Sequence, residues 1–501
     1  MTRTPTPGRR WLVRSAIAAA AIATLVAAMV APAQASDEHQ PKFTNSNQGG
    51  WTPTGGDTTP YLGWSSWSLQ ATRDTTLNPN GSYSWLTEAN ILTQAKAMAG
   101  KLKAAGYTYI NIDAGWWRKW DWTPEYDSNG RYAVDTTRFP HGIQYTIDAI
   151  HKLGLKVGIY VPVGLEKGAY DNGDFQIAGS TTCSTHDVVY SDLRTTNGWD
   201  SSYAMDFSSP CAQAWVNSEV KQFSDWGVDF LKIDGVGPGS GVGPGSTPRP
   251  SRPGQPVVDK TGPQYNNVAD VTAWNNAINK YQHRIDIQVS WAVNPAYITD
   301  WQHTSSSWRI ENDVECYCST ITGWHQINQR FTDVAKWVDY AGKGKGWNNL
   351  DSLDIGNGAA DGLTDDERQT AATLWAISAA PLYSGDDLTK LDALGVKLLT
   401  NREMIAIDQA GNPARPVSQT TNQQVWYAKH SDGSYTVALF NLDSATADVT
   451  ATLSDLGIKG KVTARDVWGK KNLGVISGSY TVSLASHASL LLTIRPQQHD
   501  R

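Results

Sequence analysis

The chain has 501 residues, with 42 basic and 48 acidic side chains and a formal net charge of −6. This mild negative charge, without a basic patch, argues against a nucleic-acid partner. The length predicts one large domain or two domains. The 22 tryptophans are many for a chain of this length. Most of them are expected in the core, and the others offer flat aromatic faces that can pack against sugar rings.

Residues 1–35 are predicted to be a signal peptide. A basic start with an Arg9-Arg10 pair precedes an apolar, alanine-rich run over residues 16–30, and the sequence A-Q-A at 33–35 matches a cleavage site. A membrane anchor is the alternative, but the run is short and no second long apolar segment follows. The arginine pair leaves the general and the twin-arginine export routes open. We therefore expect a secreted protein that has no membrane association after cleavage.

An exported chain can form disulfides, and this one has four cysteines. Four cysteines allow three pairings, of which we favour Cys183–Cys211 together with Cys316–Cys318. A metal site is not expected, because no second Cys-x-Cys motif and no pair of histidines supplies the further ligands.

Residues 36–59 are polar and rich in Gly and Pro, and they predict a flexible leader. Over residues 60–398, short apolar runs alternate with segments of helical spacing, which is typical of a (β/α)8 barrel. The expected strands are Tyr61–Trp67, Tyr107–Asp113, Lys156–Val161, Asp229–Asp234, Ile285–Ser290, Ser307–Glu311, Trp347–Asp351 and Pro381–Ser384. The clearest helical segments are Glu88–Ala105, Ile143–Leu153, Ala212–Trp226 and Asp365–Ala380. An open, doubly wound sheet is the alternative, but no G-x-G-x-x-G follows the first strand.

Two further segments complete the predicted organisation. Residues 237–263 are rich in Pro and Gly and follow the fourth strand, so they form either a loop over the barrel mouth or a passive insertion. Residues 399–501 alternate apolar and polar side chains in short runs between turns, which predicts an antiparallel β-sandwich. Its expected strands are Val425–Lys429, Tyr435–Leu442, Ala447–Leu453, Lys461–Asp466, Ser477–Leu484 and Ser489–Ile494.

Charged residues gather where two barrel strands end, which is where active sites of this fold lie. Lys232 and Asp234 are two residues apart in the fourth strand, so both side chains point to the same face. Arg309 and Asp313 mark the end of the sixth. A buried structural ion pair is the alternative for the fourth strand. Two carboxyls about 5–5.5 Å apart across the mouth would suit retaining hydrolysis of a glycoside.

Eight short motifs follow one another along the barrel segment. They are L-G-W-S-S-W at 62–67, Y-I-N-I-D at 109–113, F-P-H-G-I at 139–143, L-K-V-G-I-Y at 155–160, L-K-I-D at 231–234, W-R-I-E-N-D at 308–313, G-W-N-N-L-D at 346–351, and L-W with A-P-L at 374–382. Each motif alone is weak evidence for a family. Because all eight occur in this order, the chain resembles glycoside hydrolase family 27, the melibiase or α-galactosidase family, over nearly its whole mature length.

The resemblance implies that Asp234 is the nucleophile and Asp313 the acid/base of a double displacement, with no metal or organic cofactor. The implied substrate is an oligosaccharide or polysaccharide. The resemblance also implies residues that contact the sugar in the −1 site. Lys232 and Arg309 would hold its hydroxyls, and Trp67 would form a stacking wall. Asp113 would accept hydrogen bonds, for which a carboxylate is well suited.

The chain departs from the family where the sugar is recognised. Ala114 stands where the family has a second acid that helps to recognise galactose, and Ser290-Trp291 stands where it often has S-C-E-W, so we expect Trp291 at the sugar. The cysteine that usually follows the family's L-K-Y-D-N motif is missing, because Gly235-Val236 follow Asp234, and Leu350 replaces a proline. Losing groups that read hydroxyls relaxes or changes specificity.

We expect an α-galactosidase, the family's commonest activity. The alternatives are an isomaltose-releasing dextranase and a β-L-arabinopyranosidase. A non-catalytic sugar-binding protein is a remote alternative, because both acids are present.

Overall fold

A computed structural model describes residues 59–81, 84–196, 201–237, 266–281 and 285–497. The predicted signal peptide, the leader up to residue 58 and the loop from residue 238 onward to 263 lie outside these ranges. Within them, no helix combines the length and the hydrophobicity that crossing a bilayer requires.

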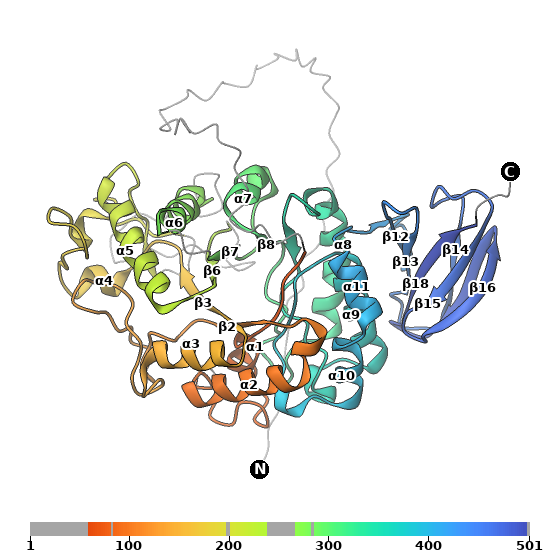
Figure 1. Ribbon diagram of the computed structural model, residues 1–501, viewed down its shortest axis with the longest axis horizontal. Coiled ribbons are helices and arrows are strands. Elements are labelled where there is room, and N and C mark those ends of the chain that lie inside the picture. Colours follow the sequence, from red (N-terminus) through yellow and green to blue (C-terminus); the bar gives the residue numbers. More distant parts are fainter. Residues whose placement is uncertain (1–58, 82–83, 197–200, 238–265, 282–284, 498–501) are drawn as a thin grey trace, which may run out of the picture. The chain divides into compact units, whose positions relative to one another are not determined.

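Eight parallel strands form one curled sheet (Figure 1). They are β1 (Leu62–Ser65), β2 (Tyr109–Ile112), β3 (Lys156–Pro162), β6 (Phe230–Asp234), β7 (Asp286–Val289), β8 (Ser307–Arg309), β9 (Trp347–Asn349) and β10 (Leu382–Ser384), in the order β10-β1-β2-β3-β6-β7-β8-β9. The backbone N–H of Leu353 donates to the carbonyl of Tyr383 at 2.7 Å, which ties the segment after β9 to β10. The predicted barrel class is confirmed, and each predicted run coincides with one of these strands.

Helices follow the strands, and nearly all of the sheet residues are buried. The helices are α1 (Trp67–Ala71), α2 (Glu88–Lys101), α3 (Gly142–Lys152), α4 (Lys167–Asp171), α5 (Pro210–Trp226), α6 (Val268–Tyr281), α7 (Ile298–Thr304), α8 (Trp324–Trp337), α9 (Asp365–Ile377), α10 (Ala393–Leu399) and α11 (Arg402–Gln409). The four helical segments predicted from the sequence correspond to α2, α3, α5 and α9. A short antiparallel pair, β4 (Leu165–Glu166) and β5 (Ser202–Tyr203), follows β3.

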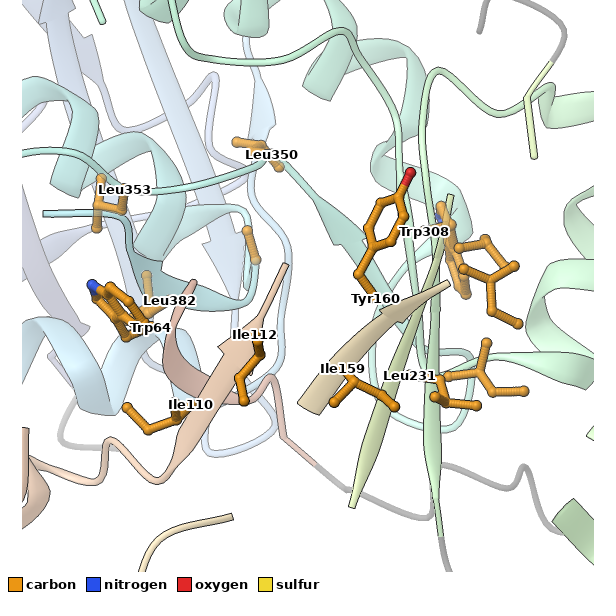
Figure 2. Packing of buried hydrophobic residues seen from close by; sticks show 14 of the residues in the cluster. Trp64, Ile110, Ile112, Ile159, Tyr160, Leu231, Trp308, Leu350, Leu353 and Leu382 are labelled. Carbon is orange, nitrogen blue, oxygen red and sulfur yellow. The ribbon is translucent and has the colours of Figure 1, made fainter. Parts of the chain in front are cut away.

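Local sequence explains where these helices begin and end. The α9 helix starts with a capping box, in which Thr364 and Glu367 satisfy each other's backbone N–H groups. The α5 helix starts with Ser209 as N-cap and Pro210 in its first turn, and it ends at Gly227 with φ +79°. Strands with both faces covered by protein need apolar side chains on both sides. Figure 2 shows this in β3, where the consecutive residues Ile159 and Tyr160 point in opposite directions.

The C-terminal part is an antiparallel β-sandwich, as predicted. One sheet has the order β11-β12-β13-β18-β15-β16 and the other pairs β14 with β17. The strands are β11 (Arg415–Pro416), β12 (Gln423–Lys429), β13 (Tyr435–Asn441), β14 (Ala447–Thr452), β15 (Lys461–Asp466), β16 (Lys471–Ser477), β17 (Ser479–Leu484) and β18 (Ser489–Pro496). Two of these strands, β11 and β16, were not predicted from the sequence. The β16 strand lies at the sheet edge, and its side chains are mostly exposed, so the alternation that marks a half-buried strand is lost there.

The sandwich and the barrel helices share apolar contacts. Phe440 of β13 packs edge-to-face on Phe331 of α8, with ring centroids 4.9 Å apart, and both side chains are fully buried. The indole N–H of Trp468 donates to the hydroxyl of Thr373 in α9 at 2.9 Å. The predicted boundary at residues 398/399 stays a prediction; α11 follows it, and the first sandwich strand begins at Arg415.

Both of the favoured disulfides are present. Cys183 pairs with Cys211 at a Cα–Cα distance of 5.3 Å, and Cys316 pairs with Cys318 at 5.2 Å. The first joins the segment before β5 to the first turn of α5, and the second lies in the segment between β8 and α8.

Phe440→Ala is expected to lower the free energy of unfolding by about 3–5 kcal/mol, because it leaves a cavity against Phe331. The matched control is Val475→Ala in the same sandwich, where the side chain is 56% exposed, and it should change stability by less than about 0.5 kcal/mol. Denaturant unfolding of both variants tests this. Equal losses in the two would contradict the shared core.

Candidate active site

A cavity of about 570 Å³ opens where the barrel strands end. Its walls come from residues at or just after the carboxyl ends of β1, β2, β3, β6, β7 and β8. The lining residues are Trp67, Asp113, Ala114, Trp117, Arg118, Trp122, Tyr160, Pro162, Glu166, Ser201, Lys232, Asp234, Trp291, Asn312, Asp313 and Tyr317. The cavity lies at the end of the barrel where the sequence analysis expected the active site.

The β6 strand delivers Lys232 and Asp234 to this cavity. Their spacing of two puts both side chains on the inner face, and both are buried. Gly235 follows with φ +77°, a conformation that favours glycine, and its N–H donates to Oδ1 of Asp234 at 2.9 Å. The chain thus leaves the strand in a turn that also holds the carboxylate.

Lys232 makes a buried ion pair with Asp113, which follows β2. Its Nζ lies 2.9 Å from Oδ2 of Asp113, and Asp113 is 1% exposed. The same oxygen accepts from the amide of Asn111 at 3.1 Å, and Oδ1 accepts from the N–H of Ala114 at 2.8 Å. Asp113 lines the cavity while protein donors already hold both of its oxygens.

Burial raises the pKa of Asp234 to about 6. The positive charge of Lys232 opposes this shift, while the negative charges of Asp313 and Asp113 add to it. Asp234 is therefore ionised above about pH 6, and Lys232 favours that state. The electrostatic contribution of Asp313 also means that the two carboxyls act on each other across the cavity.

Asp313, in the segment after β8, is held by two donors. Nη2 of Arg309 lies 2.9 Å from its Oδ1, and the hydroxyl of Tyr317 donates to its Oδ2. Arg309 also lies 2.8 Å from Oδ2 of Asp351, which follows β9. Arg309 is 1% exposed and is not among the residues that line the cavity. It lies between two carboxylates, and the sugar contact that the resemblance implied stays a prediction.

The predicted aromatic residues Trp67 and Trp291 both line the cavity and are partly exposed. The indole N–H of Trp67 donates to the hydroxyl of Tyr317 at 3.2 Å. The indole N–H of Trp291 is buried and has no hydrogen-bond partner among the described residues. The structure thus brings all the predicted sugar-site residues except Arg309 to the wall of one cavity.

One wall of the cavity was missed in the sequence. The guanidinium of Arg118 lies over the rings of Trp117 and Trp122, at 5.2 and 5.4 Å from their centroids. Glu166 pairs with Arg118 and accepts from the indole of Trp117 at 2.8 Å. Gly115, with φ +103°, allows this packing, since a Cβ there would lie 2.9 Å from the Trp122 ring. The tryptophan-rich run directly after β2 was the available signal.

Three carboxylates, those of Asp313, Glu315 and Asp351, offer oxygens within 4.8 Å of one another. Such a group can hold a cation. Arg309 already bonds two of the three, so its guanidinium supplies the positive charge at this point. The donor set does not favour a metal.

The chain matches known family models over most of its length. Residues 59–199 and 261–410 match the model described as Alpha galactosidase A, and residues 420–494 match the alpha galactosidase C-terminal beta sandwich domain. The chain is 28% identical to an alpha-galactosidase of Oryza sativa subsp. japonica over 87% of this chain and 85% of that protein. It is also 28% identical to an alpha-galactosidase of Cyamopsis tetragonoloba, over 88% of this chain and 87% of that protein.

Solved structures share the fold of this chain. A GH27 β-L-arabinopyranosidase from Geobacillus stearothermophilus superposes with a TM-score of 0.75 at 24% identity, covering 89% of this chain and 99% of that one. Alpha-galactosidase I from Mortierella vinacea gives 0.64 at 25% identity, covering 89% and 98%. The chain belongs to glycoside hydrolase family 27, the melibiase family, and it is a glycosidase that hydrolyses O-glycosyl bonds.

Proposed function

We propose that this glycosidase is a retaining α-galactosidase in which Asp234 is the nucleophile and Asp313 the acid/base. The observation that carries the proposal is that both carboxyls line one cavity at the strand ends, each beside a buried cation. The α-galactosidase names of relatives that align over most of the chain support the choice of sugar.

In the first step, a carboxylate oxygen of Asp234 attacks the anomeric carbon. The glycosidic C–O bond breaks as Asp313 gives its proton to the departing oxygen. This leaves a covalent ester between the sugar and Asp234. In the second step Asp313 accepts a proton from water, the water oxygen attacks the same carbon, and the ester bond breaks with net retention.

The two cations have different tasks in this mechanism. Lys232 keeps Asp234 ionised and presents its ammonium to the sugar. Arg309 orients the carboxyl of Asp313 through a hydrogen bond of 2.9 Å. In this mechanism it does not bind the sugar directly. Trp67 and Trp291 supply apolar walls, and Asp113 accepts from sugar hydroxyls.

An isomaltose-releasing dextranase is the second candidate. Two observations favour it: Ala114, beside Asp113, has no side-chain acceptor, and the wall of Trp117, Arg118 and Trp122 adds lining that could contact more than one sugar ring. A β-L-arabinopyranosidase remains the third, because one such enzyme has the same fold.

We also propose that the protein is secreted after removal of residues 1–35. The basic and apolar pattern of the N-terminus supports this. Two disulfides in the structure suit an oxidising compartment.

Asp234→Asn is expected to lower kcat by at least about 10³-fold, because the amide cannot form the covalent ester. The matched control is Asp408→Asn in α11, another buried carboxyl whose pKa burial raises well above its usual value, and which does not line the cavity. It should retain activity. Melting temperatures of both variants show whether each is folded, and an active, folded Asp234→Asn would contradict the assignment.

Activity should fall as the pH drops through about 6, because protonated Asp234 cannot attack. Lys232→Met removes the positive charge that opposes the raised pKa of Asp234. The acidic limb of the plot of kcat/KM against pH should therefore move to higher pH, in addition to any decrease in the maximum kcat/KM. Lys221→Met, on the exposed face of α5, is the control and should leave the limb in place. A limb that does not move in Lys232→Met would show that the lysine does not control the nucleophile.

The substrate is tested with aryl α-galactoside, aryl β-L-arabinopyranoside, aryl α-glucoside and dextran. We expect the α-galactoside to give the highest kcat/KM, with α-galactose as the first product seen by NMR. Isomaltose from dextran, together with a poor rate on the α-galactoside, would replace the first candidate by the second.

A further inference from the structure

A disulfide joins two cysteines only two residues apart, Cys316 and Cys318, beside the proposed acid/base. Their Cα atoms are 5.2 Å apart. An extended chain would place them about 6.6–7.2 Å apart, so the bridge requires a local turn. Tyr317 stands at its apex with φ +52°, a conformation that residues other than glycine rarely adopt.

The turn directs the Tyr317 side chain into the catalytic cavity, where its ring is part of the lining. Its hydroxyl donates to Oδ2 of Asp313 and accepts from the indole N–H of Trp67 at 3.2 Å. Arg309 donates to the other oxygen of Asp313 at 2.9 Å. Together the phenol and the guanidinium fix the plane of that carboxyl.

Tyr317 keeps its proton under all ordinary conditions. Burial raises its pKa, and the negative charges of Asp313 and Glu315 raise it further. The phenol is therefore a permanent donor to Asp313, and Trp67 orients it.

The polypeptide around Tyr317 has little regular structure of its own. No helix or strand covers residues 310–323, which lie within the described part of the chain. Hydrogen bonds to separate elements hold the segment. The N–H of Val314 donates to a side-chain oxygen of Asp351 at 2.8 Å, and the N–H of Arg73 donates to the carbonyl of Cys318 at 2.9 Å. Within the segment, the N–H of Cys316 donates to the carbonyl of Ile321 at 3.0 Å. The disulfide is the covalent constraint closest to Tyr317.

We propose that Tyr317 is a positioning residue for Asp313, and that the Cys316–Cys318 disulfide is the clamp that holds Tyr317 in place. The proposal rests on the proposed role of Asp313. The proposal goes beyond that role because it assigns functions to a tyrosine and a disulfide in the segment that follows β8.

A misplaced Asp313 carboxyl would slow one chemical step, the cleavage of the glycosidic bond. Asp313 protonates the departing oxygen, and the rate of cleavage depends on the orientation of this carboxyl only when the leaving group needs that proton. An alkoxide leaves poorly without it, whereas a dinitrophenolate leaves readily. General acid catalysis accelerates such steps by about 10²–10⁴-fold, and a misdirected carboxyl loses part of this factor.

The experiment compares kcat/KM for an alkyl glycoside and for a 2,4-dinitrophenyl glycoside of the sugar that the enzyme cleaves. Tyr317→Phe, which removes only the hydroxyl, should lose about 10–100-fold on the alkyl glycoside and less than about threefold on the dinitrophenyl glycoside. The double variant Cys316→Ala/Cys318→Ala should show the same selective loss. The matched control is Cys183→Ala/Cys211→Ala, which removes the other disulfide. That disulfide joins the segment before β5 to α5 and flanks no residue that bonds Asp313, so the ratio of the two rates should stay at the wild-type value.

Asp313→Ala separates failure of this proposal from failure of the proposed function. It should show the largest selective loss, and azide should restore turnover of the dinitrophenyl glycoside. Without that pattern, Asp313 is not the acid/base. If Asp313→Ala shows the pattern but Tyr317→Phe lowers kcat/KM equally for both substrates, or for neither, the positioning role is wrong. If Tyr317→Phe shows it and the folded double cysteine variant does not, the disulfide is not the clamp. Should the double variant fail to fold, the Cys183→Ala/Cys211→Ala variant, which keeps only the Cys316–Cys318 disulfide, is assayed before and after reduction with dithiothreitol. A selective loss on the alkyl glycoside after reduction supports the clamp, and an unchanged ratio of the two rates overturns it.

Discussion

The cavity end of this barrel is organised around a guanidinium that is buried between two carboxylates. Arg309 ends β8, and its Nη2 lies 2.9 Å from Asp313 and 2.8 Å from Asp351. Parallel pairing places Arg309 opposite Asn349 of β9, so that Asp351, two residues further on, reaches the same guanidinium. Removing one member of such a buried group typically costs about 3–5 kcal/mol, since a charge is left without a partner. The geometry of Asp313 is therefore tied to the register of two strands and not to a loop alone.

A second buried ion pair fixes charged side chains at another wall of the cavity. Lys232 of β6 and Asp113 after β2 are 2.9 Å apart, and both are shielded from water. Asp234 shares the inner face of β6 with Lys232 and has no cation bonded to it in the described structure. Burial and its carboxylate neighbours raise its pKa to about 6, and the lysine limits the rise. The site thus holds one carboxyl by direct hydrogen bonds to a cation and influences the other through space, an arrangement that suits groups with different tasks.

The sequence predicted the features that depend on local periodicity. Buried strands alternate with helices at regular spacing, so the barrel and its eight strands could be read directly. The spacing of Lys232 and Asp234 also places both on one face without any knowledge of the fold. The edge strand β16 was missed because exposed side chains carry no alternation. The resemblance implied a sugar contact for Arg309, but a motif records which residue is present and not which way it points. Its contacts with Asp313 and Asp351 became visible only in the structure.

Contacts between separate segments could not be predicted in this way. Tyr317 meets Trp67, which is 250 positions away, and Glu166 meets Arg118, which is 48 away. Neither separation follows a periodic pattern in the sequence, and both contacts form only when the barrel closes. The cysteines that flank Tyr317 were recognised as a pair, and the first of them is only three residues after Asp313. That Tyr317 donates a hydrogen bond to this carboxyl became visible only in the structure.

The covalent intermediate of the proposed double displacement can be trapped directly. A 2-deoxy-2-fluoro glycosyl fluoride of the preferred sugar slows both steps and should accumulate as an ester on the nucleophile. Mass spectrometry of the digested protein is expected to find one added fluorosugar, on the peptide that contains Asp234, with inactivation in proportion to labelling. Labelling of a different carboxylate, or inversion of configuration at the anomeric carbon of the product, would contradict the account.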